Sequence, residues 1–234
     1  MERVEIGIAD LDEMLSGGIP KGSVTAIIGG FGTGKSTLAL KFVYSGLVKG
    51  EKCIYISIEQ KEEEIIKSSS LFGWDLRPHI ESGALKLIRL NPSGLKTAVT
   101  KIESELPDII KEFAPKRLVI DPITLYEMIF DNEGERRQQL FNLVEIIKDS
   151  GTTSVIVSES SKESAYQSRF GLIEYIADGV ITLRNLRGTD MKSIIRLIEV
   201  SKMRMTEHSD AIKPYKITKD GIVVHMGAQV FGEF

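Results

Sequence analysis

The stretch Gly29-Gly-Phe-Gly-Thr-Gly-Lys-Ser36 decides how the rest of the chain is interpreted. It matches the phosphate-binding pattern G-x-x-x-x-G-K-[ST] in full. Residues 23–28 before it form a short β-prone apolar run, and residues 36–48 after it carry apolar side chains at helical spacing. A glycine-rich loop between a strand and a helix is the context that this motif requires. We therefore predict that residues 29–36, called the phosphate loop below, bind the phosphates of a nucleotide.

The residue types of the phosphate loop suit this chemistry. Glycines let the backbone turn its N–H groups inward around a phosphate, and the following helix directs its positive N-terminal end at the same anion. Lys35 would reach the β- and γ-phosphates, and the Ser36 hydroxyl would bind Mg²⁺. The predicted nucleotide contacts are Gly30, Phe31, Gly32, Thr33, Gly34, Lys35, Ser36 and Thr37.

Two carboxylates are candidates for the chemical step. Leu118-Val-Ile-Asp121 is an apolar strand run that ends in a carboxylate, and beside a phosphate loop such an Asp holds the Mg²⁺ shell through water. An Asp after a buried strand can also simply start a turn. Glu59 ends the next strand run after the loop, where it could be the general base that activates water. A solvated Glu in the acidic stretch of residues 59–64 is the alternative, and the residues alone leave the two evenly balanced.

The length, composition and net charge of the chain limit the class of protein to which it can belong. A length of 234 residues suits one large α/β domain or two small ones, and 42% hydrophobic with 27% charged residues is ordinary for a soluble globular protein. The net charge of −3 gives no global basic footprint for nucleic acid. No apolar run is long enough to span a membrane, and the charged N-terminus does not resemble a signal peptide. Cys53, the single cysteine, cannot form an internal disulfide, and the three histidines make no metal-ligand pattern. We expect a cytoplasmic protein.

Strand and helix patterns alternate along most of the chain. This alternation predicts an α/β fold with a mostly parallel central sheet flanked by helices, and the strand runs after residue 190 predict antiparallel additions at one edge. Pro107 is expected to end a helix over residues 95–106 and to begin a separate turn. The predicted strands are 23–28, 52–58, 85–90, 117–120, 152–157, 179–183, 193–200, 215–218 and 222–225, and the other predicted helices are 62–72 and 135–148.

Lys202-Met-Arg-Met-Thr-Glu-His208 places two cations two residues apart after an apolar strand. In a strand both would lie on one face. A solvated charged face is the commoner interpretation of such a pair. The alternative is a phosphate clamp, which has its largest effect when it comes from a neighbouring subunit.

The chain resembles the KaiC-like ATPases of the RecA/RadA superfamily over nearly its whole length. The resemblance rests on the opening segment of residues 7–22, on Gly32-Thr-Gly-Lys-Ser-Thr37, on Phe72-Gly-Trp-Asp-Leu76 and on the K-x-R-x-T-x-H stretch of residues 202–208. It also includes Tyr55-Ile-Ser-Ile-Glu-Gln60, where the family usually carries two adjacent glutamates. The first is kept as Glu59, the expected catalytic base, and the second is replaced by Gln60.

The resemblance implies a single RecA-like P-loop NTPase domain over residues 1–234, with ATP and Mg²⁺ as cofactors and slow ATP hydrolysis. It further implies active sites between the subunits of a homo-oligomeric ring, typically a hexamer. The residues that would reach the neighbour's nucleotide are Lys202, Met203, Arg204, Thr206 and His208. The clock proteins of the family autophosphorylate a Ser/Thr pair, but Glu174 and Tyr175 stand at the matching positions, so a phosphorylation cycle is not expected here.

Two functions of different classes follow from these residues. The first is an oligomeric ATPase that acts as a switch or assembly protein for an unknown partner. The second is a RadA-paralogue-like repair accessory that binds single-stranded DNA through residues 160–169, where Lys162, Tyr166 and Arg169 could contact phosphate and stack a base. Glu163 and the polar composition of this segment are equally consistent with a plain surface loop. A nucleotide-binding module without turnover is a third interpretation, against which Glu59 argues.

Overall fold

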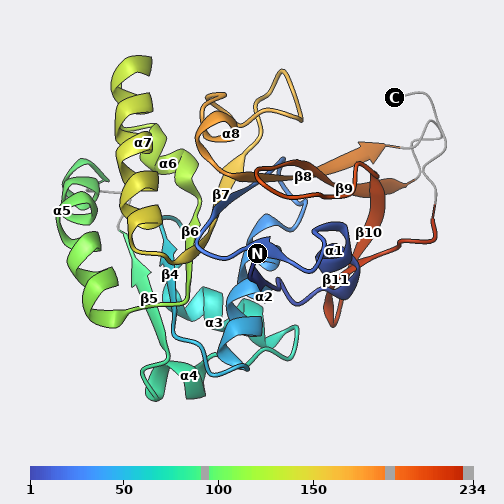
Figure 1. Ribbon diagram of the computed structural model, residues 1–234, viewed down its shortest axis with the longest axis horizontal. Coiled ribbons are helices and arrows are strands. Elements are labelled where there is room, and N and C mark those ends of the chain that lie inside the picture. The colour runs from blue at the N-terminus through green and yellow to red at the C-terminus, as the bar shows by residue number, and fades with distance from the viewer. Residues whose placement is uncertain (91–94, 188–192, 229–234) are drawn as a thin grey trace.

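One nine-stranded sheet runs through the computed structural model in the order β11-β10-β9-β8-β3-β7-β6-β4-β5 (Figure 1). The structure describes residues 1–90, 95–187 and 193–228, and for residues 95–103 only the backbone. The strands are β3 (Val24–Gly29), β4 (Cys53–Ser57), β5 (Leu85–Arg89), β6 (Arg117–Asp121), β7 (Thr153–Glu159), β8 (Gly179–Arg187), β9 (Ile194–Met203), β10 (Lys213–Thr218) and β11 (Gly221–Val224). A separate antiparallel pair is formed by β1 (Arg3–Val4) and β2 (Ile19–Pro20).

The direction of the strands follows the predicted class. The strands from β8 through β3, β7, β6 and β4 to β5 are parallel to their neighbours. At the other edge β9, β10 and β11 pair antiparallel. Ligands of parallel sheets bind at the carboxyl ends of the strands, and that edge carries the phosphate loop, Glu59 and Asp121.

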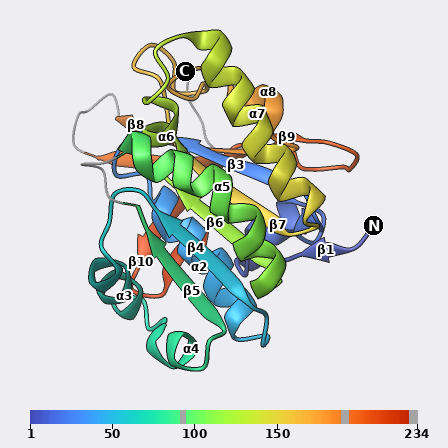
Figure 2. The same ribbon diagram turned by 90° about the vertical axis from the view of Figure 1, so that its left-hand side faces the viewer.

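Helices cover both faces of the sheet (Figures 1 and 2). They are α1 (Ala9–Met14), α2 (Lys35–Leu47), α3 (Glu62–Ser70), α4 (Arg77–Glu81), α5 (Leu95–Phe113), α6 (Ile123–Glu127), α7 (Glu133–Asp149) and α8 (Ile173–Ile176). Successive residues of β3 enter different cores: Ile27 packs with Phe42 of α2, whereas Ile28 packs with Leu140 of α7 and Ile110 of α5. Burial on both faces explains why the predicted parallel strands are continuous apolar runs.

The prediction of a separate turn beginning at Pro107 is wrong. Pro107 lies inside α5, which continues to Phe113. A proline inside a helix removes one hydrogen bond and costs about 3 kcal/mol. Leu106 and Ile110, on either side of it in sequence, are only 1% and 4% exposed. Packing of both side chains into the core outweighs the local preference of the proline.

No helix among the described residues is both long enough and apolar enough to cross a membrane.

Glu127, the last residue of α6, is an unusual member of the core. Its side chain is fully buried, and neither carboxyl oxygen has a hydrogen-bond partner within the described residues. Burial, with a smaller contribution from Glu174, raises the pKa of Glu127 to about 8, although Arg136 opposes the rise. The carboxyl group is therefore protonated in the folded protein at neutral pH.

Glu127 should make the protein less stable as the pH rises. Between the ordinary Glu pKa of 4.5 and the folded-state pKa of about 8, the folded state holds a proton that the unfolded chain has released. The free energy of unfolding should therefore fall across this window, by up to about 1.4 kcal/mol per pH unit. Glu127→Gln should remove this slope, because an amide does not titrate. Urea unfolding of both proteins from pH 5 to pH 9 measures it.

The two stability profiles should nearly coincide at pH 5 and separate by a few kcal/mol at pH 8, with the Gln variant more stable. Glu133→Gln, at an exposed position of α7, is the matched control and should follow the parent at every pH. Parallel profiles for Glu127→Gln and the parent would contradict a buried titrating carboxyl group.

Candidate functional site

The phosphate loop connects the end of β3 to the start of α2. Gly32 and Gly34 have φ values of 71° and 86°, which side chains with a Cβ rarely adopt. Gly34 is the N-cap of α2, and no side chain caps this end of the helix. The N–H groups of the first helical turn therefore point into the loop without a capping partner. These N–H groups and the positive end of the helix form a cradle for an anion.

Side chains from the C-terminal strands hold the outer side of the loop. Tyr215 of β10 donates its hydroxyl hydrogen to the Thr33 carbonyl. Asn185 Nδ2 donates to the Phe31 carbonyl at 3.2 Å, and Arg196 Nε donates to the Gly32 carbonyl at 3.4 Å. With its carbonyls bound on the outside, the loop keeps its N–H groups for the inside. Nothing in the sequence pattern had pointed to these three residues, because each follows the loop residue that it binds by more than 150 positions.

Lys35 lies among carboxylates at the start of α2. Its Nζ donates to the Gly30 carbonyl at 2.9 Å. Burial lowers the pKa of Lys35, and the negative charges of Asp121, Glu159 and Glu59 act in the opposite direction. The structure thus brings together the lysine and both predicted carboxylates, and it adds Glu159.

Asp121 is almost completely buried at the end of β6. Tyr55 on the neighbouring strand β4 donates its hydroxyl hydrogen to Asp121 Oδ2 at 2.6 Å. Burial raises the pKa of Asp121, while the hydrogen bonds from Tyr55 and Ser36 and the charge of Lys35 lower it. The Ser36 hydroxyl and the Asp121 carboxylate are therefore in contact, and hard oxygen groups of this kind are what Mg²⁺ prefers. The residues present fit a magnesium site of the predicted type.

Glu59 and Glu159 lie at the same edge of the sheet, just after β4 and at the end of β7, and β6 lies between these two strands. Glu59 is exposed just beyond β4. The turn that contains it is closed by the Ser57 hydroxyl, which donates to the Gln60 carbonyl and accepts from the Gln60 N–H. Glu159 pairs with Gly29 in the β3–β7 register and forms an ion pair with Arg169 at 3.3 Å. Glu159 is not apparent from the sequence, because the apolar run ends at Val157, whereas backbone pairing carries β7 two residues further.

Residues 160–169, the predicted DNA-binding loop, are largely occupied by contacts within the chain. Arg169 is paired with Glu159. The Tyr166 hydroxyl accepts a hydrogen bond from Arg184, whose guanidinium carbon lies 4.3 Å from the centre of the Tyr166 ring. Of the three groups proposed for DNA, Lys162 alone has no such contact within the described structure. These contacts do not favour the DNA hypothesis.

Lys202 and Arg204 lie together against α8, on one side of the chain as expected. Lys202 Nζ donates to the carbonyls of Glu174 and Ala177 at 2.7 and 2.6 Å, and Arg204 Nη2 donates to the Tyr175 carbonyl at 2.9 Å. Burial, together with the charge of Arg204, lowers the pKa of Lys202. Both cations are far from the phosphate loop of their own chain, since they lie at the opposite end of β9 from Arg196.

The other members of this stretch differ in exposure. The Met203 side chain is only 6% exposed and packs in the core, so it does not face the surface that carries the two cations. Thr206 Oγ1 accepts a hydrogen bond from Arg3. His208 is partly exposed, with its Nδ1 3.3 Å from the Ser209 carbonyl oxygen.

Comparisons with known proteins give a consistent result. A family model described as "ATPase: KaiC" matches residues 4–229. The circadian clock oscillator protein KaiC of Parathermosynechococcus lividus is 32% identical over 225 residues, which cover 93% of this chain and 41% of that protein. The same protein of Nostoc sp. strain PCC 7120 is 30% identical and is covered to 44%, so this chain spans less than half the length of these relatives. A solved KaiC-like protein from Pyrococcus horikoshii OT3 superposes with a TM-score of 0.85 at 31% identity, covering 96% of this chain and 99% of that one.

Proposed function

The chain belongs to the KaiC family of ATPases, and from this premise we propose that it binds ATP with Mg²⁺ and hydrolyses it slowly as one subunit of a homo-oligomeric ring. Its task would be that of a nucleotide-dependent switch or assembly protein, with residues 1–234 acting as one ATPase domain. The proposal rests above all on the Lys35 ammonium group lying among Asp121, Glu59 and Glu159 beside the phosphate loop.

Each proposed residue has a distinct task. Backbone N–H groups of the phosphate loop and Lys35 hold the β- and γ-phosphates, and Ser36 and Asp121 hold Mg²⁺, the latter through water. Mg²⁺ supplies neutralisation of phosphate charge when it is bound. Glu59 accepts the proton of the attacking water, for which its exposed carboxylate at the end of β4 is suitably placed.

Tyr55→Phe should weaken the binding of Mg²⁺ together with nucleotide. The Tyr55 hydroxyl fixes one oxygen of Asp121 and helps keep that buried carboxylate ionised, so its loss removes a charge-assisted hydrogen bond worth about 1.5–3 kcal/mol. We expect roughly a tenfold or larger rise in the Mn²⁺ dissociation constant in the presence of a non-hydrolysable ATP analogue, measured by electron paramagnetic resonance. Asp121→Asn should have the larger effect of the two. Tyr44→Phe, in an aromatic cluster with Trp74, is the control, and equal Mn²⁺ affinity in all proteins would contradict this role.

The arrangement of β9 supports assembly into a ring. Its first residues lie beside the phosphate loop, and its last residues lead to Lys202 and Arg204. Lys202 and Arg204 follow the loop-binding Arg196 by six and eight residues, which in extended chain corresponds to about 20–26 Å. When the cation end of one copy meets the phosphate loop of the next, the contact is head-to-tail, and such contacts form a ring when the rotation between copies closes.

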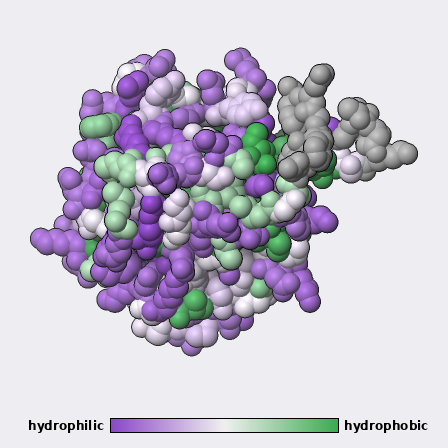
Figure 3. Space-filling view, turned by 45° about the vertical axis from the view of Figure 1, so that its right-hand side comes forward, coloured by the Kyte–Doolittle hydropathy of each residue, from purple (hydrophilic) through white to green (hydrophobic). Residues whose placement is uncertain are grey.

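An apolar patch beside the phosphate loop consists of Phe31 on the loop and Ile194 of β9, which shares a sheet face with the loop-binding Arg196. These two side chains are 93% and 52% exposed, and Figure 3 shows exposed apolar side chains on this side of the molecule. Because Asn185 and Arg196 bind the loop carbonyls, the Phe31 side chain is directed into solvent. A neighbouring copy would bury this patch.

Phe31→Ser should therefore weaken ATP-dependent assembly and leave ATP binding in place, because residue 31 would contact the phosphates through its backbone N–H and not through its side chain. Burial of a phenylalanine side chain is worth about 1.5–3 kcal/mol, so the protein concentration at half-assembly should rise roughly tenfold or more. Mass photometry with and without ATP measures assembly, and calorimetry measures binding. Leu71→Ser, at a 73% exposed position at the end of α3, should assemble like the parent. A parent protein that stays monomeric with saturating ATP would reject the ring itself.

Binding of single-stranded DNA is the second candidate function, and it depends on the result of one experiment. The engaged state of Tyr166 and Arg169 gives this candidate little support. ATPase rates with and without single-stranded DNA, across a salt series, would revive it if stimulation appeared and declined with salt.

A further inference from the structure

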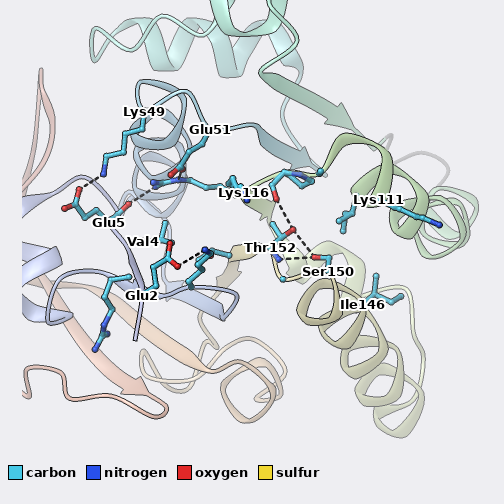
Figure 4. Close-up of a pocket in the computed structure, with 18 of the residues that line it drawn as sticks. Glu2, Val4, Glu5, Lys49, Glu51, Lys111, Lys116, Ile146, Ser150 and Thr152 are labelled. Carbon is cyan, nitrogen blue, oxygen red and sulfur yellow. Dashed lines mark hydrogen bonds and ion pairs between the residues drawn. The ribbon is translucent and has the colours of Figure 1, made fainter.

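A cavity of about 830 Å³ lies at the end of the sheet opposite the phosphate loop (Figure 4). It opens where β6 and β7 begin, whereas Asp121 and Glu159 stand where these strands end. The N-terminal segment forms one wall and the last turns of α5 and α7 form the other. A volume of this size falls in the range of small-molecule sites, about 300–1,000 Å³.

The lining is net positive in a chain whose net charge is −3. The cationic side chains are Arg3, Lys21, Lys49, Lys111, Lys116 and Arg117, and the anionic ones are Glu2, Glu5 and Glu51. All three carboxylates are already neutralised, by Lys21, Lys49 and Arg117 respectively. Of the three cations left without an ion pair within the described residues, Arg3 is held by the Leu15 and Gly18 carbonyls and by Thr206. Lys111 and Lys116 therefore remain for an external anion.

Arg117 gives the cavity a buried cation. Its side chain is only 1% exposed. It donates through Nε to Glu51 and through Nη1 to the carbonyls of Glu5 and Phe42. Its Nη2 group has no acceptor within the described residues, although it carries two N–H donors. A guanidinium held rigidly by its other nitrogens is a strong ligand for phosphate or carboxylate oxygens.

The other surfaces of the cavity suit an organic body. Pro107, Ala114 and Ile146 supply apolar contacts, and the floor carries the hydroxyl groups of Ser150 and Thr152, which bond to each other at 2.9 Å. The two hydroxyl oxygens keep acceptor capacity for a ligand donor.

Helix ends explain only part of this charge. Lys111 lies in the last turn of α5, where a cation complements the negative end of the helix dipole. Lys116 lies beyond the helix, next to β6, and Arg117 belongs to the strand, so neither is accounted for in this way.

From these observations we propose that this cavity is a second ligand site, separate from the phosphate loop, which binds a phosphorylated organic molecule. Arg117 Nη2, Lys116 and Lys111 receive the phosphate group, and the organic part lies against Pro107, Ala114 and Ile146. A phosphate ester matches this site better than a monocarboxylate, because two unpaired lysines beside the Arg117 Nη2 donors favour a multiply charged group.

Affinity labelling with pyridoxal 5′-phosphate tests the site, since this probe combines an aromatic body, a phosphate ester and an aldehyde. A lysine amine condenses with the aldehyde, releases water and forms an imine, which added borohydride reduces to a stable secondary amine. The full chain with Lys35→Ala is used, so that the phosphate loop carries no lysine. Peptide mass spectrometry then gives the labelling rate of each lysine.

Labelling of Lys116 or Lys111 should saturate with probe concentration and proceed at least tenfold faster than that of Lys67 and Lys162, two exposed lysines elsewhere. Adenosine 5′-monophosphate should protect these lysines at lower concentration than inorganic pyrophosphate, because the apolar wall binds the organic part. Equal, non-saturating rates at all exposed lysines would overturn the proposal. Protection by pyrophosphate at the same or lower concentration would overturn its organic part and leave a simple anion site.

Discussion

Replacing Lys35 with alanine should abolish tight ATP binding. Lys35 supplies the buried positive charge of the phosphate loop, and three carboxylates around the same point would then repel a bound triphosphate without compensation. We expect the ATP dissociation constant to rise at least about 100-fold, equivalent to about 2.7 kcal/mol. Isothermal titration calorimetry with MgATP measures this directly, and Lys67→Ala, at an exposed position on α3, is the matched control.

Thermal unfolding separates lost binding from lost folding. Burial lowers the pKa of Lys35, which means that burying this charge costs free energy in the folded protein. The alanine variant should therefore unfold at a temperature no lower than that of the parent in the absence of nucleotide. The parent should be stabilised further by MgATP, and the variant should not be. Unchanged ATP affinity in a folded variant would reject the phosphate loop as the nucleotide site.

Glu59→Gln should retain ATP binding and lose most hydrolysis. An amide cannot accept the proton of the attacking water, and loss of a positioned general base reduces rates about 10²–10⁴-fold. Phosphate release under single-turnover conditions measures the chemical step. Gln60 cannot take over, since it is an amide whose backbone is held by the Ser57 hydroxyl.

Glu159→Gln is the informative control for this prediction. Glu159 also acts on Lys35, but its carboxylate is engaged by Arg169. If Glu59 is the base, Glu159→Gln should slow hydrolysis much less than Glu59→Gln. The reverse order would move the role of base to Glu159.

Mixing two inactive variants tests whether Arg204 acts across the subunit interface. Glu59→Gln and Arg204→Ala proteins should each be nearly inactive alone. After subunit exchange, some interfaces would join an intact Glu59 to an intact Arg204, and part of the activity should return. Arg204 would have to leave the Tyr175 carbonyl and its ion pair with Asp178 at 3.5 Å to reach a neighbour, which 46% exposure of its side chain permits. Mixed oligomers that remain inactive would count against a clamp supplied by the neighbour.

The sequence by itself determined the features that depend on neighbours along the chain. The phosphate loop was identifiable because its glycines, lysine and serine must stand at fixed spacing between a strand and a helix. Asp121 could be predicted as a candidate because it is the carboxylate that ends a buried strand. The parallel sheet with antiparallel additions followed from the order of strand and helix patterns, because both side-chain periodicities are local properties.

Only the tertiary structure decided the contacts between side chains that are distant in sequence. The pairing of β4 with β6 lets the Tyr55 side chain reach Asp121, and the pairing of β3 with β7 extends to Glu159. The Tyr215 hydroxyl likewise reaches the phosphate loop across the sheet. Packing carries α5 through Pro107 and buries Met203. These outcomes depend on which strands are neighbours and on how the two cores are filled. Such non-local choices are governed by burial and hydrogen bonding across the fold, and no short stretch of sequence contains them.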